Sequence, residues 1–333
     1  MTQSNEVKSI INCENPGEAN IVLMAVPYDE TSSFGKGADK GPAAIRGCLD
    51  RQIELFHPET NTTPVEELAI AWQRLDMYKT LVTLSDQHED DVRVTLSPEE
   101  MVEAVASAYQ ENLRRKQFTI LLGGEHSVSI GVWKALKLRY KPEEVTILQI
   151  DAHFDLRDDD SDFADKPHGR FAHCCVMRRA AELGFRIVSV GIRAYSKEEL
   201  DYANQMGGSA KNLQVKYFGW PRRSDWLLIG KIMKAISTSN VYITLDVDGL
   251  DPSFMPATGT PVQGGLDWYF THQLLQEIFL SRKVIGADIV EVSPRPNDTL
   301  TEYGAAQICY DMIAAHNKNR KRSYFELRNF PAI

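Results

Sequence analysis

The chain has 333 residues, of which 43% are hydrophobic and 25% charged, a composition typical of a globular protein rather than of a disordered or fibrous one. A formal net charge of −9 gives no reason to expect nucleic acid as a partner, and it suits a small cationic ligand or metal ions. No stretch approaches the roughly 18 apolar residues that span a membrane, and the N-terminus lacks a signal-peptide pattern. The five cysteines are scattered, which argues against a disulfide framework, so we expect a reducing, cytoplasmic location.

Hydrophobic runs and turn signals alternate along the chain. They predict strands over 21–27, 118–122, 145–150, 187–192, 241–245 and 284–291. They also predict helices that begin near 42 and 98, and further helices over 127–140, 176–183, 197–206, 225–237, 267–281 and 301–316. Strands that alternate with helices are typical of a parallel sheet covered by helices on both faces. We therefore expect a single α/β domain over residues 1–333.

One region fits this alternation poorly. Residues 61–95 carry acidic clusters and a single short apolar segment, so we expect an irregular insertion there rather than a linker between domains. The helix that follows has a clear start, because Ser97 precedes Pro98 and Glu100 completes a capping box.

Acidic residues and histidines directly follow two of the buried strands. Asp151, His153 and Asp155 come after one strand, and Asp246 and Asp248 come after another. Residues two apart on an extended chain point the same way, so each set converges on one side. Carboxylates packed this closely repel one another unless a cation neutralises them. The pattern therefore predicts a metal site with more than one ion at the carboxyl edge of the sheet.

A further ligand comes from the turn at 123–127, Gly-Gly-Glu-His-Ser, whose glycines allow a sharp bend after a strand. This turn brings His126 to the same edge of the sheet. The resulting set has the composition of a dinuclear centre: His126, Asp151, His153, Asp155, Asp246 and Asp248. Mixed carboxylate and imidazole ligands suit manganese, and they also accept iron, nickel, cobalt or zinc.

With these residues the chain resembles the ureohydrolase family, which includes arginases and agmatinases. The resemblance rests on three motifs in the family's order: GGEHS at 123–127, DAHFD at 151–155 and DVDGLDPSFMPATGTPVQGGL at 246–266. It extends from about Pro27 to Glu291. It implies an α/β/α sandwich around a mostly parallel sheet of roughly eight strands, and a homotrimer or homohexamer.

The resemblance also implies roles for the site residues. Two manganese ions would share Asp151 and Asp246. His126 and Asp155 would complete the ligands of one ion, and the two remaining histidine and aspartate ligands would complete those of the other. A hydroxide shared by the ions would attack the carbon of a planar guanidinium and release urea. Asp155 would stabilise the developing intermediate, and Glu291 would bind the guanidinium nitrogens through charge-assisted hydrogen bonds.

A histidine is also expected to move protons during this reaction. His173 leads directly into a predicted helix, as the corresponding histidine of agmatinase-type sequences does, so we assign it the general acid and base role. His168, which Gly169 follows, is the alternative. The other histidines stand in no motif and are expected at the surface: His57, His88, His272 and His316.

The loop at 156–167 bears on the substrate. Arginases carry a Ser/Asn-rich stretch here that reads the α-amino and α-carboxylate groups of arginine, whereas this loop carries several aspartates. An acidic mouth favours agmatine, which has an ammonium at its far end, although the same aspartates could simply solvate the loop. Guanidinobutyrate, guanidinopropionate, guanidine, arginine and formimidoylglutamate are the alternative substrates. A metal-stabilised binding or regulatory protein without activity is the alternative class.

Overall fold

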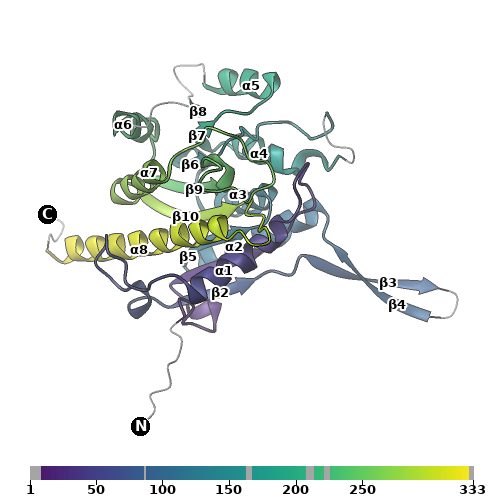
Figure 1. Ribbon diagram of the computed structural model, residues 1–333, viewed down its shortest axis with the longest axis horizontal. Coiled ribbons are helices and arrows are strands. Elements are labelled where there is room, and N and C mark those ends of the chain that lie inside the picture. Colours follow the sequence, from purple (N-terminus) through teal and green to yellow (C-terminus); the bar gives the residue numbers. More distant parts are fainter. Residues whose placement is uncertain (1–8, 86–87, 163–166, 208–213, 221–225, 330–333) are drawn as a thin grey trace, which may run out of the picture.

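The centre of the computed structural model, which describes residues 9–85, 88–162, 167–207, 214–220 and 226–329, is a parallel sheet of eight strands (Figure 1). The strands run in the order β2-β1-β5-β10-β9-β6-β7-β8, and every neighbouring pair is parallel. Their bounds are β1 Ile21–Val26, β2 Ile70–Arg74, β5 Phe118–Gly123, β6 Val145–Ile150, β7 Arg186–Ile192, β8 Val215–Gly219, β9 Asn240–Asp246 and β10 Lys283–Val290. The expected parallel sheet of about eight strands is confirmed.

Helices cover both faces of this sheet. One face packs against α1 (Gly41–Arg51), α6 (Trp226–Ala235), α7 (Trp268–Ser281) and α8 (Leu300–Asn329). The other face packs against α2 (Pro98–Arg114), α3 (Ser129–Arg139), α4 (Val176–Glu182) and α5 (Lys197–Gly207). The three layers form the expected α/β/α sandwich.

The two cores follow from the alternation of side chains along each strand. In β5, Ile120 and Leu122 belong to the core under α1 and α8, while Leu121 belongs to the core under α2 and α3. Every residue of β5 is buried, which explains why the strand is apolar except for Thr119. The capping box that starts α2 is also present: Ser97 accepts a hydrogen bond from the backbone N–H of Glu100, whose carboxylate accepts one from Ser97 N–H.

The region over 61–95 is more regular than expected. It contains the edge strand β2 and an antiparallel hairpin of β3 (Tyr78–Ser85) and β4 (His88–Thr95), which projects from the body of the molecule in Figure 1. The sequence signal for this hairpin is weak because acidic residues with low strand propensity interrupt it at 89–91.

Two other elements differ from the expectation. Strand β8 was not expected, because only Val215 of its residues is fully buried and the strand therefore lacks a continuous apolar run. The last helix continues well beyond residue 316, to Asn329. None of the helices in the described part of the chain is long and apolar enough to cross a membrane.

Candidate active site

Four neighbouring strands in the middle of the sheet bring the candidate ligands together. Strands β5, β10, β9 and β6 are adjacent and parallel, so their carboxyl ends meet at one edge. The turn after β5 carries His126, β10 is followed by Glu291, and the other ligands lie at the ends of β6 and β9. Open α/β sheets bind their ligands at this edge. All six candidate metal ligands and Glu291 therefore converge, although they lie as much as 165 residues apart in the chain.

The turn that carries His126 depends on a glycine. A Cβ atom on Gly124 would lie 1.9 Å from the carbonyl oxygen of Tyr28, which no other residue could accommodate. Gly124 N–H donates to Val26 O and its carbonyl accepts from Glu291 N–H at 2.8 Å. The close approach thus ties the end of β5 to both neighbouring strands.

The first ligand cluster surrounds the Nδ1 atom of His126. This nitrogen lies 3.0 Å from Oδ2 of Asp155, 3.4 Å from Oδ2 of Asp151 and 3.5 Å from Oδ2 of Asp246. All four side chains are buried. Among the described residues, the donor atoms of His126, Asp151 and Asp155 lie close enough to hold one metal ion.

The second cluster shares Asp151. The Nδ1 atom of His153 lies 3.0 Å from Oδ2 of Asp248 and 3.7 Å from Oδ1 of Asp151. These three residues also offer donor atoms at metal-binding separations. Asp151 therefore faces one cluster with each of its two oxygens, the arrangement required of a carboxylate that bridges two ions.

The protonation of His126 can be inferred from its other nitrogen. Nε2 lies 2.9 Å from the hydroxyl of Thr244, which donates its own proton to Asp288 at 2.6 Å. Thr244 therefore accepts from His126, so Nε2 carries a proton. Nδ1 has no hydrogen-bond partner among the described residues and faces three carboxylate oxygens. A metal ion among these oxygens would take the place of a proton on Nδ1, and the Thr244 contact is the kind that orients a histidine ligand.

The buried carboxylates of the two clusters disfavour one another's charged forms. Burial and the charge of Asp151 raise the pKa of Asp155 to about 7. Burial and the charges of Asp248 and Asp151 raise the pKa of Asp246 well above its ordinary value. A cation held among these groups reverses the effect, because it stabilises their charged forms. The electrostatics of the site therefore also fit bound metal.

Two site residues have strained backbones. Asp155 has φ of 54° and Glu291 has φ of 66°, in the left-handed region that few non-glycine residues adopt. The carbonyl of Asp155 accepts from the N–H groups of Met177 and Arg178 at the start of α4, and Glu291 N–H donates to Gly124. These bonds hold the strained residues in place, and such strain is concentrated at functional sites.

Glu291 and His173 lie close together on the wall of the cavity. Oε1 of Glu291 accepts from His126 N–H at 2.9 Å and lies 3.7 Å from Nδ1 of His173. The Nε2 atom of His173 lies 3.2 Å from the hydroxyl of Ser33. Burial, together with the charges of His153 and His126, lowers the pKa of His173 to about 3. His168 instead lies 3.5 Å from Asp160 and is not among the residues that line the cavity.

The cavity above the ligand clusters has a volume of about 350 Å³. Its lining includes site residues that the sequence indicated: His153, Asp155, His173, Asp246, Asp248 and Glu291. Sequence reasoning did not identify the other residues that line it: Ser33, Arg157, Cys174, Ala194, Tyr195, Ser196, Glu199 and Thr260. Glu199 is only 4% exposed and accepts from the N–H groups of Leu156 and Ser196. The pattern Ser196-Lys-Glu-Glu199 is a capping-box signal that could have drawn attention to this carboxylate.

The aspartates of the loop after Asp155 do not form the acidic mouth that the sequence suggested. Asp158 pairs with Arg179 at 2.9 Å, and Asp160 is buried and accepts from the backbone of His168. Asp162 pairs with Arg157. None of these described aspartates lines the cavity, and Asp165 lies outside the described residues.

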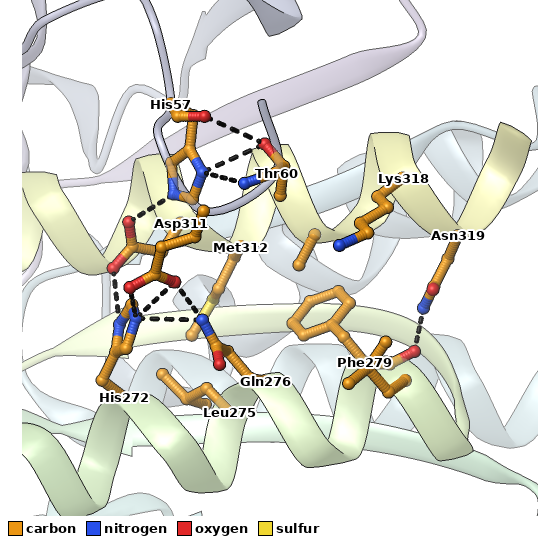
Figure 2. A pocket seen from close by; sticks show the side chains of 13 residues that line it. His57, Thr60, His272, Leu275, Gln276, Phe279, Asp311, Met312, Lys318 and Asn319 are labelled. Carbon is orange, nitrogen blue, oxygen red and sulfur yellow. Dashed lines mark hydrogen bonds and ion pairs between the residues drawn. The ribbon is translucent and has the colours of Figure 1, made fainter. Parts of the chain in front are cut away.

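Three of the histidines expected at the surface have specific contacts instead. Figure 2 shows His57 and His272 on opposite sides of Asp311, whose carboxylate lies 2.9 Å from His57 Nε2 and 3.1 Å from His272 Nδ1. His57 is 7% exposed, and these groups line a separate cavity of about 250 Å³ between α7 and α8. The ring of His316 stacks on Phe118 at 4.0 Å. The side chain of His88 lies outside the described residues.

Comparison with known proteins places this geometry in context. The sequence profile described as the arginase family matches residues 19–314. The chain is 32% identical over 309 residues to an N(1)-aminopropylagmatine ureohydrolase of Synechocystis sp., covering 92% of each chain. It is 33% identical over 297 residues to a protein of the same name from Thermus thermophilus, covering 89% of this chain and 90% of that one. The crystal structure of agmatine ureohydrolase of Thermoplasma volcanium superposes with a TM-score of 0.74 at 26% identity, covering 97% of both chains.

Proposed function

Because the chain belongs to the arginase family over residues 19–314, we propose that it hydrolyses a guanidinium C–N bond and releases urea and an amine. The match to the arginase family confirms the family that the sequence motifs indicated. The observation that carries the proposal is the convergence of two metal-ligand clusters and Glu291 on one cavity. The substrate that we propose is agmatine, which would give putrescine and urea.

We assign the metal ligands as the sequence motifs suggested. His126, Asp155, Asp151 and Asp246 would hold one ion, with Asp151 and Asp246 shared with the second. His153 and Asp248 would complete the second site. Bound divalent ions, for which manganese is our proposal, lower the pKa of a water molecule so that a nucleophile exists at neutral pH. The unpartnered Nδ1 atom of His126 and the shared position of Asp151 support this assignment.

The side chains around the clusters would handle the substrate and its protons. Glu291 points a buried carboxylate at the cavity and would pair with the planar guanidinium. Burial and the charge of Glu125 raise the pKa of Glu291, and a bound cation would restore its charged form. Asp155 would hold the reacting centre by hydrogen bonding. His173, a neutral imidazole within reach of Glu291, would accept a proton from the attacking water and pass it to the leaving amine.

The lining of the cavity also supports a substrate with a positively charged tail. Glu199 is a buried carboxylate on the cavity wall, and an ammonium group reaching it would form a charge-assisted pair. The loop aspartates Asp158, Asp160 and Asp162 do not carry this argument, because they do not line the cavity. The relatives named after aminopropylagmatine and agmatine agree with such a tail.

A second group of substrates is favoured by Arg157. Its guanidinium also lines the cavity, with Nε 3.9 Å from Oε2 of Glu199. A carboxylate tail, as in guanidinobutyrate, guanidinopropionate, formimidoylglutamate or arginine, would pair with this cation. We rank this group second because Arg157 is already paired with Asp162.

The test is a substrate panel on protein loaded with manganese. Agmatine, arginine, guanidinobutyrate, guanidinopropionate, guanidine and formimidoylglutamate are compared by urea or ammonia release. We expect the highest kcat/KM with agmatine. Faster turnover of another compound would change the substrate but keep the reaction class, whereas no turnover of any compound would favour a binding protein. The homotrimer or homohexamer and the cytoplasmic location stay predictions.

A further inference from the structure

The turn that carries His173 is held from outside by a threonine on another loop. His173 begins a short 3₁₀ turn, His173–Cys175, whose preceding residue provides no side-chain cap. The backbone N–H of His173 instead donates to the hydroxyl of Thr31, at 2.9 Å. The first N–H groups of a helical turn lack intrahelical acceptors, so Thr31 supplies the acceptor that the local sequence does not.

Thr31 is itself oriented by a buried carboxylate. Its hydroxyl donates to Oε1 of Glu125 at 2.8 Å. Glu125 also accepts from the backbone and the hydroxyl of Ser127, at 2.8 and 2.7 Å. Thr31 is 2% exposed and Glu125 is fully buried. Because the proton of Thr31 points at Glu125, the oxygen lone pairs of Thr31 face His173 N–H.

Hydrogen bonds to Asp29 close the loop that carries Thr31. The Asp29 carboxylate accepts from the N–H groups of Gly37 and Ala38, at 2.5 and 3.0 Å, and closes the loop on itself. The same loop carries Ser33, whose hydroxyl lies 3.2 Å from Nε2 of His173. This loop therefore contacts both the backbone and the imidazole ring of His173.

We propose that Thr31 is a positioning residue that fixes His173 for proton transfer, and that Glu125 sets the orientation of its hydroxyl. The proposal rests on the function proposed above, because it concerns the proton-transfer step. A hydroxyl is required at this position, since only a group that both donates and accepts can satisfy Glu125 and His173 N–H together. Glu125 lies next to His126 in the chain, so the arrangement joins the turn bearing a metal ligand to the turn bearing His173.

The prediction concerns Thr31→Val, which keeps the shape of the side chain and removes its hydroxyl. Two buried groups lose a partner, and the His173 turn is free to shift. A displacement of about 1 Å at a catalytic group costs up to about 100-fold in rate. We therefore expect kcat to fall roughly 10- to 100-fold with little change in KM, because Glu291 and the ligand clusters stay in place. Thr31→Ser keeps the hydroxyl and should recover most of the activity.

A double-mutant cycle separates positioning from a general loss of structure. If Thr31 acts through His173, then Thr31→Val should have no further effect on kcat in the His173→Ala background. The matched control is Thr119→Val, since Thr119 is a buried threonine on β5 whose hydroxyl has no partner among the described residues. This control should leave kcat unchanged. An undiminished effect of Thr31→Val in the His173→Ala background would overturn the proposal.

A second readout does not depend on turnover. In protein loaded with diamagnetic zinc, the imidazole resonances of His173 are assigned by comparison with His173→Ala. Thr31→Val should shift or broaden the His173 resonances, while Thr31→Ser and Thr119→Val should not. Unchanged His173 resonances in Thr31→Val would overturn the proposal even if no substrate is found. If the resonances move but His173→Ala keeps full activity, the proton-transfer role of His173 fails and the positional contact stands.

Discussion

The carboxylate of Glu291 accepts a hydrogen bond of 2.9 Å from the backbone N–H of His126, so the residue proposed to bind the guanidinium is tied to a metal ligand. The two residues end neighbouring strands, β10 and β5, and Glu291 N–H returns a bond to Gly124. Substrate position and metal position are therefore coupled through the backbone. A substitution at Glu291 that removes the charge but keeps a hydrogen-bond acceptor can therefore separate substrate binding from the contact with His126.

Glu291→Gln should weaken substrate binding without releasing metal. The amide oxygen of glutamine can still accept from His126 N–H, but the negative charge is lost. Replacing a charged hydrogen-bond partner of the guanidinium should lower kcat/KM for agmatine by about 10- to 100-fold. Metal content, measured by inductively coupled plasma spectrometry, should equal that of the wild type. Loss of metal, or an unchanged kcat/KM, would contradict the assigned role.

Asp151→Asn should remove both metal binding and activity. Asp151 belongs to both ligand clusters, so a neutral side chain there weakens two sites at once. The control is Asp158→Asn, because Asp158 is an aspartate of the neighbouring loop that is paired with Arg179 outside the cavity. It should keep full metal content and activity. An Asp151→Asn protein that retains two ions for each chain would rule out the shared position.

The charge of the substrate tail can be tested without mutating the protein. Agmatine, n-butylguanidine and guanidinobutyrate share the guanidinium and differ at the far end by a positive, a neutral and a negative group. We expect kcat/KM to fall in that order, by about tenfold or more at the first step, because a charge-assisted pair with Glu199 is lost. The neutral compound is the control for chain length. The reverse order would assign tail recognition to Arg157.

The stability of the fold should depend on the ionisation of His272. The hydrogen bond that His272 donates to the carboxylate of Asp311 raises the pKa of His272 to about 9, from an ordinary value of 6.5. A raised folded-state pKa means that the stabilisation is full below pH 6.5 and is lost as the pH rises through about 9. The destabilisation caused by His272→Ala, measured by urea unfolding, should therefore shrink by roughly 1–2 kcal/mol between about pH 7 and pH 10.

His316→Ala serves as the control for this measurement. Burial lowers the pKa of His316 to about 4, so its ring is neutral in the folded and unfolded states over the same range. Its effect on the free energy of unfolding should stay constant from about pH 7 to pH 10. If the effect of His272→Ala on the free energy of unfolding is also constant over this pH range, the charge of His272 contributes nothing to stability.

The strands and site residues could be predicted best where a buried strand leads directly into the site. The buried strands that precede Asp151 and Asp246 are mostly apolar, so both the strands and the direction of the residues after them could be predicted. The edge strand β8 could not, because it buries only Val215 fully. The hairpin of β3 and β4 pairs only with itself in the sheet topology, so no buried apolar run marks it.

The residues around the candidate site were harder to predict than its ligands. Thr31 and Glu199 each accept from a backbone N–H that is distant in sequence. No motif surrounds Thr31, and the capping-box pattern at Glu199 indicates the start of a helix rather than a site. The loop aspartates were read as a charged mouth, because composition does not reveal that Asp158 and Asp160 have partners elsewhere. His272 of α7 likewise contacts Asp311 only when α7 and α8 pack together, and His57 does so only when the segment after α1 packs on α8.

The most direct test of the central claim is a crystal structure of the protein loaded with manganese, with anomalous difference maps at the manganese edge. We predict two peaks about 3.5–4 Å apart at the carboxyl edge of the sheet, as in other two-metal hydrolytic sites. Asp151 should lie between them, with His126 bound to one ion and His153 to the other. A single peak, or none near these side chains, would contradict the account.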